Sequence, residues 1–376
     1  MKNESMRRKC FTGMLAAVVW GTGVASGQIF QPTIPDFEPA VVFEVSVGGP
    51  CGIASADFLR TAQVGDPIVI AGQDGFPEIA VAGAGMAFFS LSSFSCSVSS
   101  DDPSIVILRN TGDWSPDPLN GLVEHQRLDI PAGIRTTELA FADVTGENGP
   151  DLVLLGYNSD TLTGYMLVYK NQGNGFFDDG SINEPPEIFT VSDLLFRGLV
   201  AEDFDLDGDI DIIAAASNCK LPEDKVVVFQ NMTEENLGDF DFAALLPIDL
   251  GISGGTAPGD IVAGDFFPFG GGGTPLLDFV TPNTLSPSIT KAANLGNLDF
   301  VPLGEDKPSG CAFTWDFVTA TSGLFGADTL WDFAAVREID LAVSVFTGVS
   351  AGQFENNCDW DNISVLINKM VGSVGP

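Results

Sequence analysis

Positive charge and histidine are scarce in this chain. It has 16 lysine and arginine residues against 51 acidic residues, and its formal net charge is −35 at pH 7. A surface of this charge repels nucleic acid and anionic membranes, so we expect neither nucleic-acid binding nor membrane insertion. The single histidine, His125, lies outside the acidic loops described below, which argues against a catalytic metal centre there.

Long apolar runs are also missing. No stretch after the N-terminus approaches twenty uninterrupted apolar residues, so no membrane anchor is visible. The N-terminus has the three parts of a secretory signal: a basic segment at 7–9, a short apolar segment at 11–20 and small residues at 25–27. We therefore predict a signal peptide over residues 1–27, one domain over residues 28–376, and a secreted protein, extracellular or periplasmic.

Uninterrupted helical patterns are excluded by turn-forming residues. The 43 glycines and 23 prolines break any long helix. The apolar run at 225–229 is short, rich in β-branched residues and bounded by turn formers, as in a strand. The run at 211–216 has no polar alternation after its first residue, which suits a strand buried on both faces. The chain is predicted to be all-β.

A unit of about 60 residues repeats along the chain. Each copy has an apolar strand ending in Asp, a loop, a second strand opened by an acid, and a third strand ending in Asn. Asp143 and Asp203 end the first strands of the second and third copies, 60 residues apart, and Asn171 and Asn231 close the third strands at the same spacing. Such a period is typical of a propeller or a solenoid.

The ends of the repeat suggest how it closes. We count five four-stranded units, and an eroded sixth is possible. The fifth unit is assigned a first strand ending at Asp316 and a third strand at 363–368, after which eight residues remain. This unit therefore lacks a fourth strand, and the N-terminal segment at 35–44 has the pattern of the missing one. We expect that segment to close the ring, because closure hides sheet edges.

The densest acidic loop lies in the third copy, where aspartates alternate with other residues around Gly208. Closely spaced carboxylates repel one another unless a cation lies among them, and calcium prefers oxygen ligands. An EF-hand would need Glu at the twelfth loop position, which is Ala214, and helices where strands are expected. We predict a structural calcium site whose ligands are Asp203, Asp205, Asp207, Asp211 and the Asp209 carbonyl.

This loop resembles the hallmark of the FG-GAP/VCBS repeat family, which also builds the propeller of integrin α chains. The pattern is Asp-x-Asp/Asn-x-Asp-Gly-x-x-Asp between the first two strands of a blade, and the third copy matches it fully. The second copy matches a softened form through Asp143, Thr145, Glu147 and Asp151. The resemblance implies a β-propeller of about five blades with calcium in some of them.

Five cysteines remain after the predicted signal, and a secreted chain favours disulfides. In a propeller, the connection before the first strand and the connection between strands two and three emerge on the same face. Cys51 and Cys96 occupy these places in the first copy, and Cys311 and Cys358 occupy them in the fifth. We predict the pairs Cys51–Cys96 and Cys311–Cys358, which leave Cys219 as the odd thiol.

Three functional hypotheses remain open. The leading one is a non-enzymatic binding or scaffold module for a protein or glycan at the cell exterior, with the insertions at 89–102 and 348–361 as its contact surface. The alternative is a carbohydrate-active enzyme, a lyase or a hydrolase, on the same scaffold. No acid–base pair stands out by its spacing, and a fold alone does not confer an activity, so no catalytic residue is assigned. An adhesin stiffened by calcium is the third.

The aromatic residues after the closing asparagines have two interpretations. Trp114, Phe176 and Phe177 are predicted to pack between blades, with carbohydrate stacking as the alternative. His125 has polar and charged neighbours on either side and is expected on an exposed connection.

Overall fold

The computed structural model describes most of residues 50–362. The longest gaps in this range are 62–68, 113–120, 178–184, 251–257, 268–275, 307–316 and 324–331. The predicted signal, the N-terminal strand at 35–44 and the side chains of the five remaining cysteines lie outside the described residues. No helix in the described part is long and apolar enough to cross a membrane.

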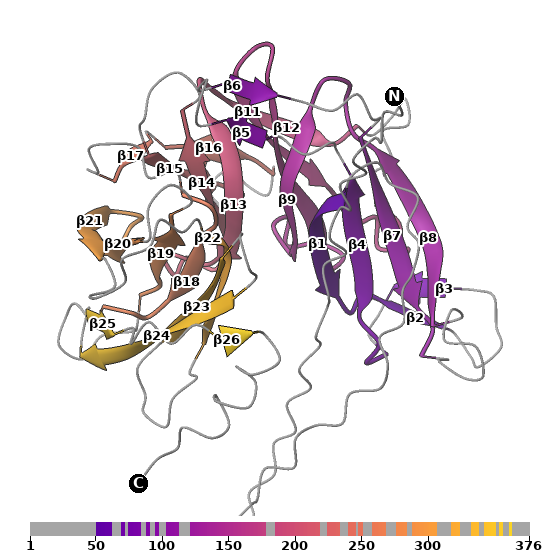
Figure 1. The fold of residues 1–376 in the computed structure, drawn as a ribbon. Helices are drawn as coiled ribbons and strands as arrows, with labels where there is room; N and C mark the ends of the chain where they lie inside the picture. Colours follow the sequence, from indigo (N-terminus) through magenta and orange to yellow (C-terminus); the bar gives the residue numbers. More distant parts are fainter. Residues whose placement is uncertain are drawn as a thin grey trace, which may run out of the picture. The chain divides into compact units, whose positions relative to one another are not determined.

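Five antiparallel sheets, here termed blades one to five, follow one another along the chain (Figure 1). Blades one to three contain β1 (Pro50–Ala56), β4 (Glu78–Gly83), β7 (Ser104–Asn110) and β8 (Leu122–Asp129); β9 (Arg135–Ala142), β10 (Asp151–Asn158), β11 (Thr163–Tyr169) and β12 (Glu187–Ser192); and β13 (Leu195–Glu202), β14 (Asp211–Ser217), β15 (Asp224–Asn231), β16 (Phe242–Ala244) and β17 (Ile248–Asp249). Blades four and five contain β18 (Val262–Gly264), β19 (Asp278–Pro282), β20 (Ile289–Asn294) and β21 (Phe300–Asp306); and β22 (Phe317–Gly323), β23 (Asp332–Arg337), β24 (Ala342–Ser350), β25 (Gln353–Glu355) and β26 (Asp361–Asn362). Two short hairpins belong to the connections of blade one, β2 (Leu59–Thr61) with β3 (Val69–Ala71) and β5 (Phe88–Ser90) with β6 (Ser95–Ser97).

The first strands of successive blades contact one another: β1 contacts β9, β9 contacts β13, β13 contacts β18, and β18 contacts β22. We term them the inner strands. Each blade therefore contributes its first strand to a common centre and its later strands to the outside. This is the organisation of a β-propeller, and the predicted fold class is confirmed, with five blades in the described residues.

Apolar cores fill the spaces between consecutive blades. The first joins blades one and two, for example through Ile105 and Leu154, and the second joins blades two and three through Val153 and Phe229. Every residue of β14 is buried, as the unbroken apolar run in its sequence predicts. Burial of one large aliphatic or aromatic side chain stabilises by about 1.5–3 kcal/mol, so these interfaces hold the blades together.

A buried acid braces each of blades one to four at the start of its second strand. One oxygen of this carboxylate accepts hydrogen bonds from amides of the loop after the inner strand. In blades two to four the other oxygen accepts the amide of the closing asparagine, at 2.8–2.9 Å. Burial raises the pKa of these acids, to about 7 for Glu78, about 6 for Asp151, and about 7 for Asp211 and Asp278.

The closing asparagines also link neighbouring blades. The Asn231 side-chain amide donates to Ile210 O in its own blade and to Val144 O in blade two. In the same way Asn294 donates to Leu277 O at 3.1 Å and to Phe204 O of blade three at 2.8 Å. Asn231 and Asn294 therefore connect neighbouring blades, whereas the Asn171 side-chain amide donates to Pro150 O in its own blade.

Blade five differs from the strands assigned to it by the repeat. Its first strand is β22 rather than a strand ending at Asp316, and its third strand is β24 rather than the segment at 363–368. The repeat pattern predicts an asparagine at the end of the third strand, whereas β24 ends in Ser350. β25 and β26 pair with the far side of β24, which is the edge where we expected the N-terminal segment.

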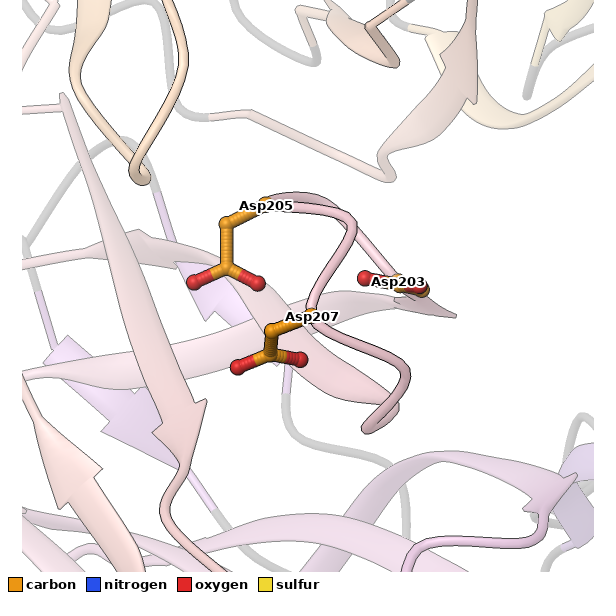
Figure 2. Close-up of side chains that lie close together, drawn as sticks. All are labelled: Asp203, Asp205 and Asp207. Atoms are coloured by element: carbon orange, nitrogen blue, oxygen red, sulfur yellow. The ribbon is translucent and has the colours of Figure 1, made fainter. Parts of the chain in front are cut away.

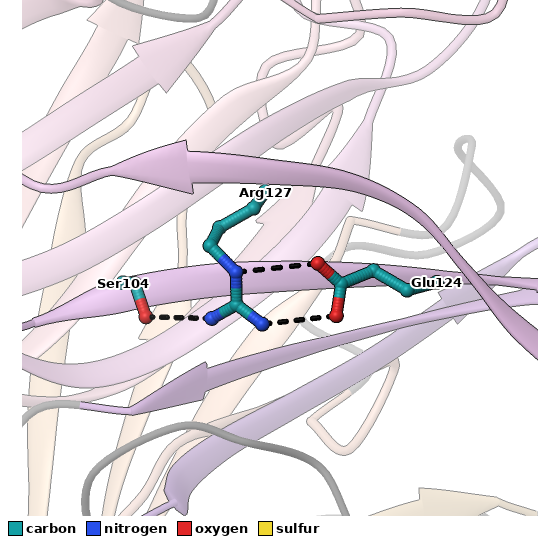
Figure 3. A network of polar contacts seen from close by, with 3 residues as sticks. All are labelled: Ser104, Glu124 and Arg127. Carbon is teal, nitrogen blue, oxygen red and sulfur yellow. Dashed lines mark hydrogen bonds and ion pairs between the residues drawn. The ribbon is translucent and has the colours of Figure 1, made fainter.

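The last strand of blade one, β8, carries a polar surface. Arg127 forms two hydrogen bonds with the Glu124 carboxylate, at 3.2 and 2.9 Å, and one with Ser104 Oγ at 3.4 Å (Figure 3). His125 lies on this strand rather than on a loop, stacks against Phe176 and contacts Gly175 O at 2.7 Å. Phe177 is buried, as predicted, whereas the Phe176 ring is 43% exposed.

Candidate functional site

The acidic loop of blade three brings three carboxylates together. Asp203, Asp205 and Asp207 each offer an oxygen within 4.8 Å of the other two, and Figure 2 shows their side chains on this loop. The loop can turn so tightly because Gly208 has a φ of 106° and Leu206 a φ of 65°. Asp203 Oδ1 and Asp205 Oδ1 are buried without a hydrogen-bond partner.

The hydrogen bonds of the loop leave the negative charge uncompensated. Gly208 N donates to Asp203 Oδ2 at 3.2 Å, and Asp209 N donates to Asp207 Oδ1 at 2.9 Å. Burial raises the pKa of Asp205, and the charge on Asp207 raises it further. Three oxygen donors with two unpartnered buried atoms are the donor set that a hard cation such as calcium prefers. The residues present therefore fit a calcium ion.

The structure gives one predicted ligand, Asp211, a different set of contacts from those of this cluster. Both oxygens of Asp211 accept backbone amides, from Phe204 at 3.3 Å and from Asn231 at 2.9 Å, so this residue lies behind the loop as a brace. The amide of Asp209 takes part in the loop, as described above. Among the described residues, the group of Asp203, Asp205 and Asp207 is the one with metal-ligand geometry.

The softened loop of blade two is arranged differently. The Thr145 hydroxyl donates to Asp151 Oδ2 at 3.0 Å, so these two predicted ligands hydrogen-bond to each other. Asp143 and Glu147 are exposed. Positive φ angles at Asn148 and at Gly149 show that the turn is tight, but it does not gather its carboxylates as the loop of blade three does.

A second acidic site, at the inner strands, was not expected from the sequence. In blades one, two, three and five, a β-bulge interrupts the pairing of the inner strand with its neighbour, five residues before the inner strand ends. Bulges re-aim side chains and are frequent beside active sites. We term the next position, four residues before each inner strand's end, the bulge level. Its members are Gly52, Glu138, Gly198, Asp260 and Thr319.

Two of these five residues are acids, and they influence each other. Burial raises the pKa of Glu138 to about 8, and the neighbouring charge of Asp260 raises it further, while the Leu139 amide lowers it. Glu138 therefore carries its proton at neutral pH. Asp260 Oδ1 accepts the Ile261 amide at 2.8 Å. A buried carboxyl group that retains its proton, with the charge of a second carboxylate acting on it, is the arrangement from which acid–base pairs are built.

Sequence reasoning missed this pair because it searched for carboxylates close together along the chain. Glu138 and Asp260 are more than one hundred residues apart. An alignment of the repeat copies contains a sign of this pair. Counted back from the aspartate that follows each inner strand, the bulge level is Gly in blades one and three but an acid in blades two and four.

Comparison with known proteins finds similarity in solved structures. The chain is similar to the periplasmic gluconolactonase PpgL of Pseudomonas aeruginosa, with 14% identity and a TM-score of 0.47 over 84% of this chain and 72% of that one. It is also similar to a protein from Lactobacillus plantarum, with 12% identity and a TM-score of 0.44 over 83% and 71%. No family model matches, and no curated protein matches.

The leading functional hypothesis is corrected. We expected a non-enzymatic binding or scaffold module, but the similar structure from P. aeruginosa is that of an enzyme. From the sequence we assigned most carboxylates to the acidic loops. Glu138 and Asp260, at the bulge level, lie outside those loops and influence each other. The binding module is therefore withdrawn, and the enzymatic alternative stands as a proposal.

Proposed function

We propose that this chain is a carbohydrate-active hydrolase whose acid–base pair is Glu138 and Asp260. The feature that supports this is the buried Glu138 at the bulge level of the inner strands, whose pKa is raised to about 8 by burial and by the charge of Asp260. Enzymes that cleave C–O bonds with two carboxyl groups need this division of protonation states, which only different environments can produce.

The chemistry follows from the two protonation states. Asp260 accepts a proton from a water molecule as its oxygen attacks the carbon of the scissile C–O bond. Glu138 donates its proton to the leaving oxygen as that bond breaks. The products are two hydroxyl-bearing fragments, or a hydroxy acid where the substrate is a sugar lactone. Return of a proton from Asp260 to Glu138, through solvent, restores the starting state.

The substrate class follows from charge. The chain has a net charge of −35, and a carboxylate lies in the site itself. Both repel anionic sugars such as uronates, on which a lyase would act by removing a proton beside a carboxylate. We therefore propose a neutral saccharide or a sugar lactone, recognised outside the cytoplasm. The predicted signal over residues 1–27 supports that location.

Turnover of a defined panel tests this function. Purified protein is assayed with neutral oligosaccharides, uronate oligosaccharides and glucono-1,5-lactone, corrected for spontaneous hydrolysis. We expect activity on a neutral member and a bell-shaped pH dependence of kcat/KM with its alkaline limb near pH 8. Glu138→Gln and Asp260→Asn should each lower kcat/KM by about 10²–10⁴-fold. The exposed Glu124→Gln serves as the control and should retain full activity.

Two outcomes would overturn the proposal. One is a folded wild-type protein that turns over no member of the panel. The other is activity that survives both substitutions, which would move the chemistry elsewhere.

We also propose that Asp203, Asp205 and Asp207 hold a structural calcium ion, with the Asp209 carbonyl as a further donor, as in the FG-GAP/VCBS repeats that the loop resembles. Two buried oxygens without partners support this. Bound calcium would supply the positive charge that this loop lacks. It would also tie the end of β13 to the start of β14. In blade two Thr145 and Asp151 hydrogen-bond to each other, so we restrict the proposal to blade three.

A further inference from the structure

Gly198, the bulge-level residue of blade three, packs against the backbone that carries Asp260. A Cβ atom placed on Gly198 would lie 2.5 Å from Asp260 Cα, 2.6 Å from Asp260 C and 2.6 Å from Ile261 N. Real Cβ atoms do not approach other atoms this closely. All three neighbours are backbone atoms, so no change of side-chain rotamer can relieve the contact.

The place of Asp260 depends on this packing because its own strand is short. β18 has three residues, and Asp260 lies two residues before it. On the side of its own blade, the chain is fastened by the bond from Gly259 N to Pro282 O at 2.8 Å and by a bridge between Pro258 and Asn283. On the other side it rests on Gly198 of β13.

We infer that Gly198 is a positioning residue, whose missing side chain lets the bulge of β13 hold Asp260 opposite Glu138. The catalytic consequence rests on the proposed function, whereas the packing does not. Glu138, on β9, and Asp260, beside β18, come from blades that flank blade three, so Gly198 lies between the two elements. A bulkier residue here pushes the Asp260 backbone away and changes the separation of the two carboxyl groups.

The pair itself reports such a displacement. The Asp260 charge is one of the causes that raise the pKa of Glu138, beside burial, and the Leu139 amide opposes them. If Asp260 moves away, the effect of its charge on the Glu138 pKa becomes weaker, whereas the burial of Glu138 and its hydrogen bond with the Leu139 amide remain. We therefore measure the Glu138 titration directly by carboxyl ¹³C NMR, assigned by the loss of its signal in Glu138→Gln.

The test compares Gly198→Ala with a second glycine whose substitution also perturbs the backbone, but away from the pair. Gly173→Ala places its Cβ 2.5 Å from the Asn148 side-chain oxygen at a φ of 71°, so it strains a turn of blade two. We expect the Glu138 midpoint to fall by at least half a pH unit in Gly198→Ala, toward the value in Asp260→Asn, and to stay unchanged in Gly173→Ala. An unchanged midpoint in Gly198→Ala overturns the inference.

A measurement on the wild-type protein decides the matter if Gly198→Ala does not fold. Close packing by Gly198 predicts that the Ile261 amide exchanges with solvent as slowly as the amides of β14, and rapid exchange overturns the inference. In active protein, Gly198→Ala should shift the alkaline limb of the kcat profile and lower kcat more than it raises KM. If the wild type hydrolyses no substrate, the proposed function fails while the titration and the exchange still decide the role of Gly198.

Discussion

At the residue scale, Glu138 couples the stability of the protein to pH. Burial and the neighbouring Asp260 raise its pKa from the model-compound value of 4.5 to about 8. The folded chain therefore holds this proton more tightly than the unfolded chain does. Its contribution to stability is complete below pH 4.5 and is lost as the pH rises through about 8. A buried carboxylate that destabilises the fold at high pH is typical of a functional site, where a residue is retained for its reactivity at a cost in stability.

Glu138→Gln should remove this pH dependence. At pH 4 the variant and the wild type should melt at similar temperatures, because Glu138 is then neutral in the folded state and largely neutral in the unfolded state. At pH 9 the variant should melt higher, because glutamine has no charge to bury. Melting curves across this range check the prediction, with Glu124→Gln as an exposed control that should follow the wild type. A variant that melts lower at pH 9 would contradict it.

At the element scale, the loop from Asp203 to Asp211 combines local and long-range requirements. The alternation of acids and the position of Gly208 are local, and they were sufficient to predict a turn that gathers carboxylates. The role of Asp211 was not local. Its oxygens accept amides from Phe204 and Asn231, the second of which lies 20 residues away, so it serves the blade rather than the cluster.

Calcium should stabilise the protein through this loop. Saturating calcium is expected to raise the melting temperature of the wild type, because an ion that binds the folded state at a hundred times its Kd adds about 2.7 kcal/mol. Asp205→Asn and Asp207→Asn should each abolish most of this response. Asp160→Asn, in an exposed turn of blade two, should respond like the wild type. Equal melting in calcium and in chelator for the wild type would rule out the site.

At the scale of the whole molecule, hydrogen bonds between blades supplement the apolar cores. Asn294 is 2% exposed and its side-chain amide bridges blades four and three. Asn231 repeats this link between blades three and two. Because a buried carbonyl left without a donor costs free energy, each link makes the separation of neighbouring blades unfavourable.

Asn294→Ala should therefore destabilise the fold by about 2–4 kcal/mol, since it leaves the buried Phe204 carbonyl and the half-buried Leu277 carbonyl without this donor. Asn158→Ala, at the half-buried end of β10, removes bonds from the local amides of Asp160 and Thr161 and should cost about 1 kcal/mol or less. Urea denaturation of the two variants measures the difference. If both variants lose the same free energy of unfolding, the hydrogen bond between blades contributes no more to stability than a local one.

Features that depend on neighbours along the chain were predictable from the amino-acid sequence. The sequence predicted the strands, because β-branched runs between turn formers have few other conformations, and it predicted the repeat, because each blade reuses one pattern of acids and asparagines. It failed in blade five, where the closing asparagine is missing from the third strand. Only the tertiary structure decided that Glu138 and Asp260 form a pair and that Asp211 is a brace. The reason is physical: pKa values and hydrogen-bond partners are set by burial and by groups that folding brings together from distant parts of the chain.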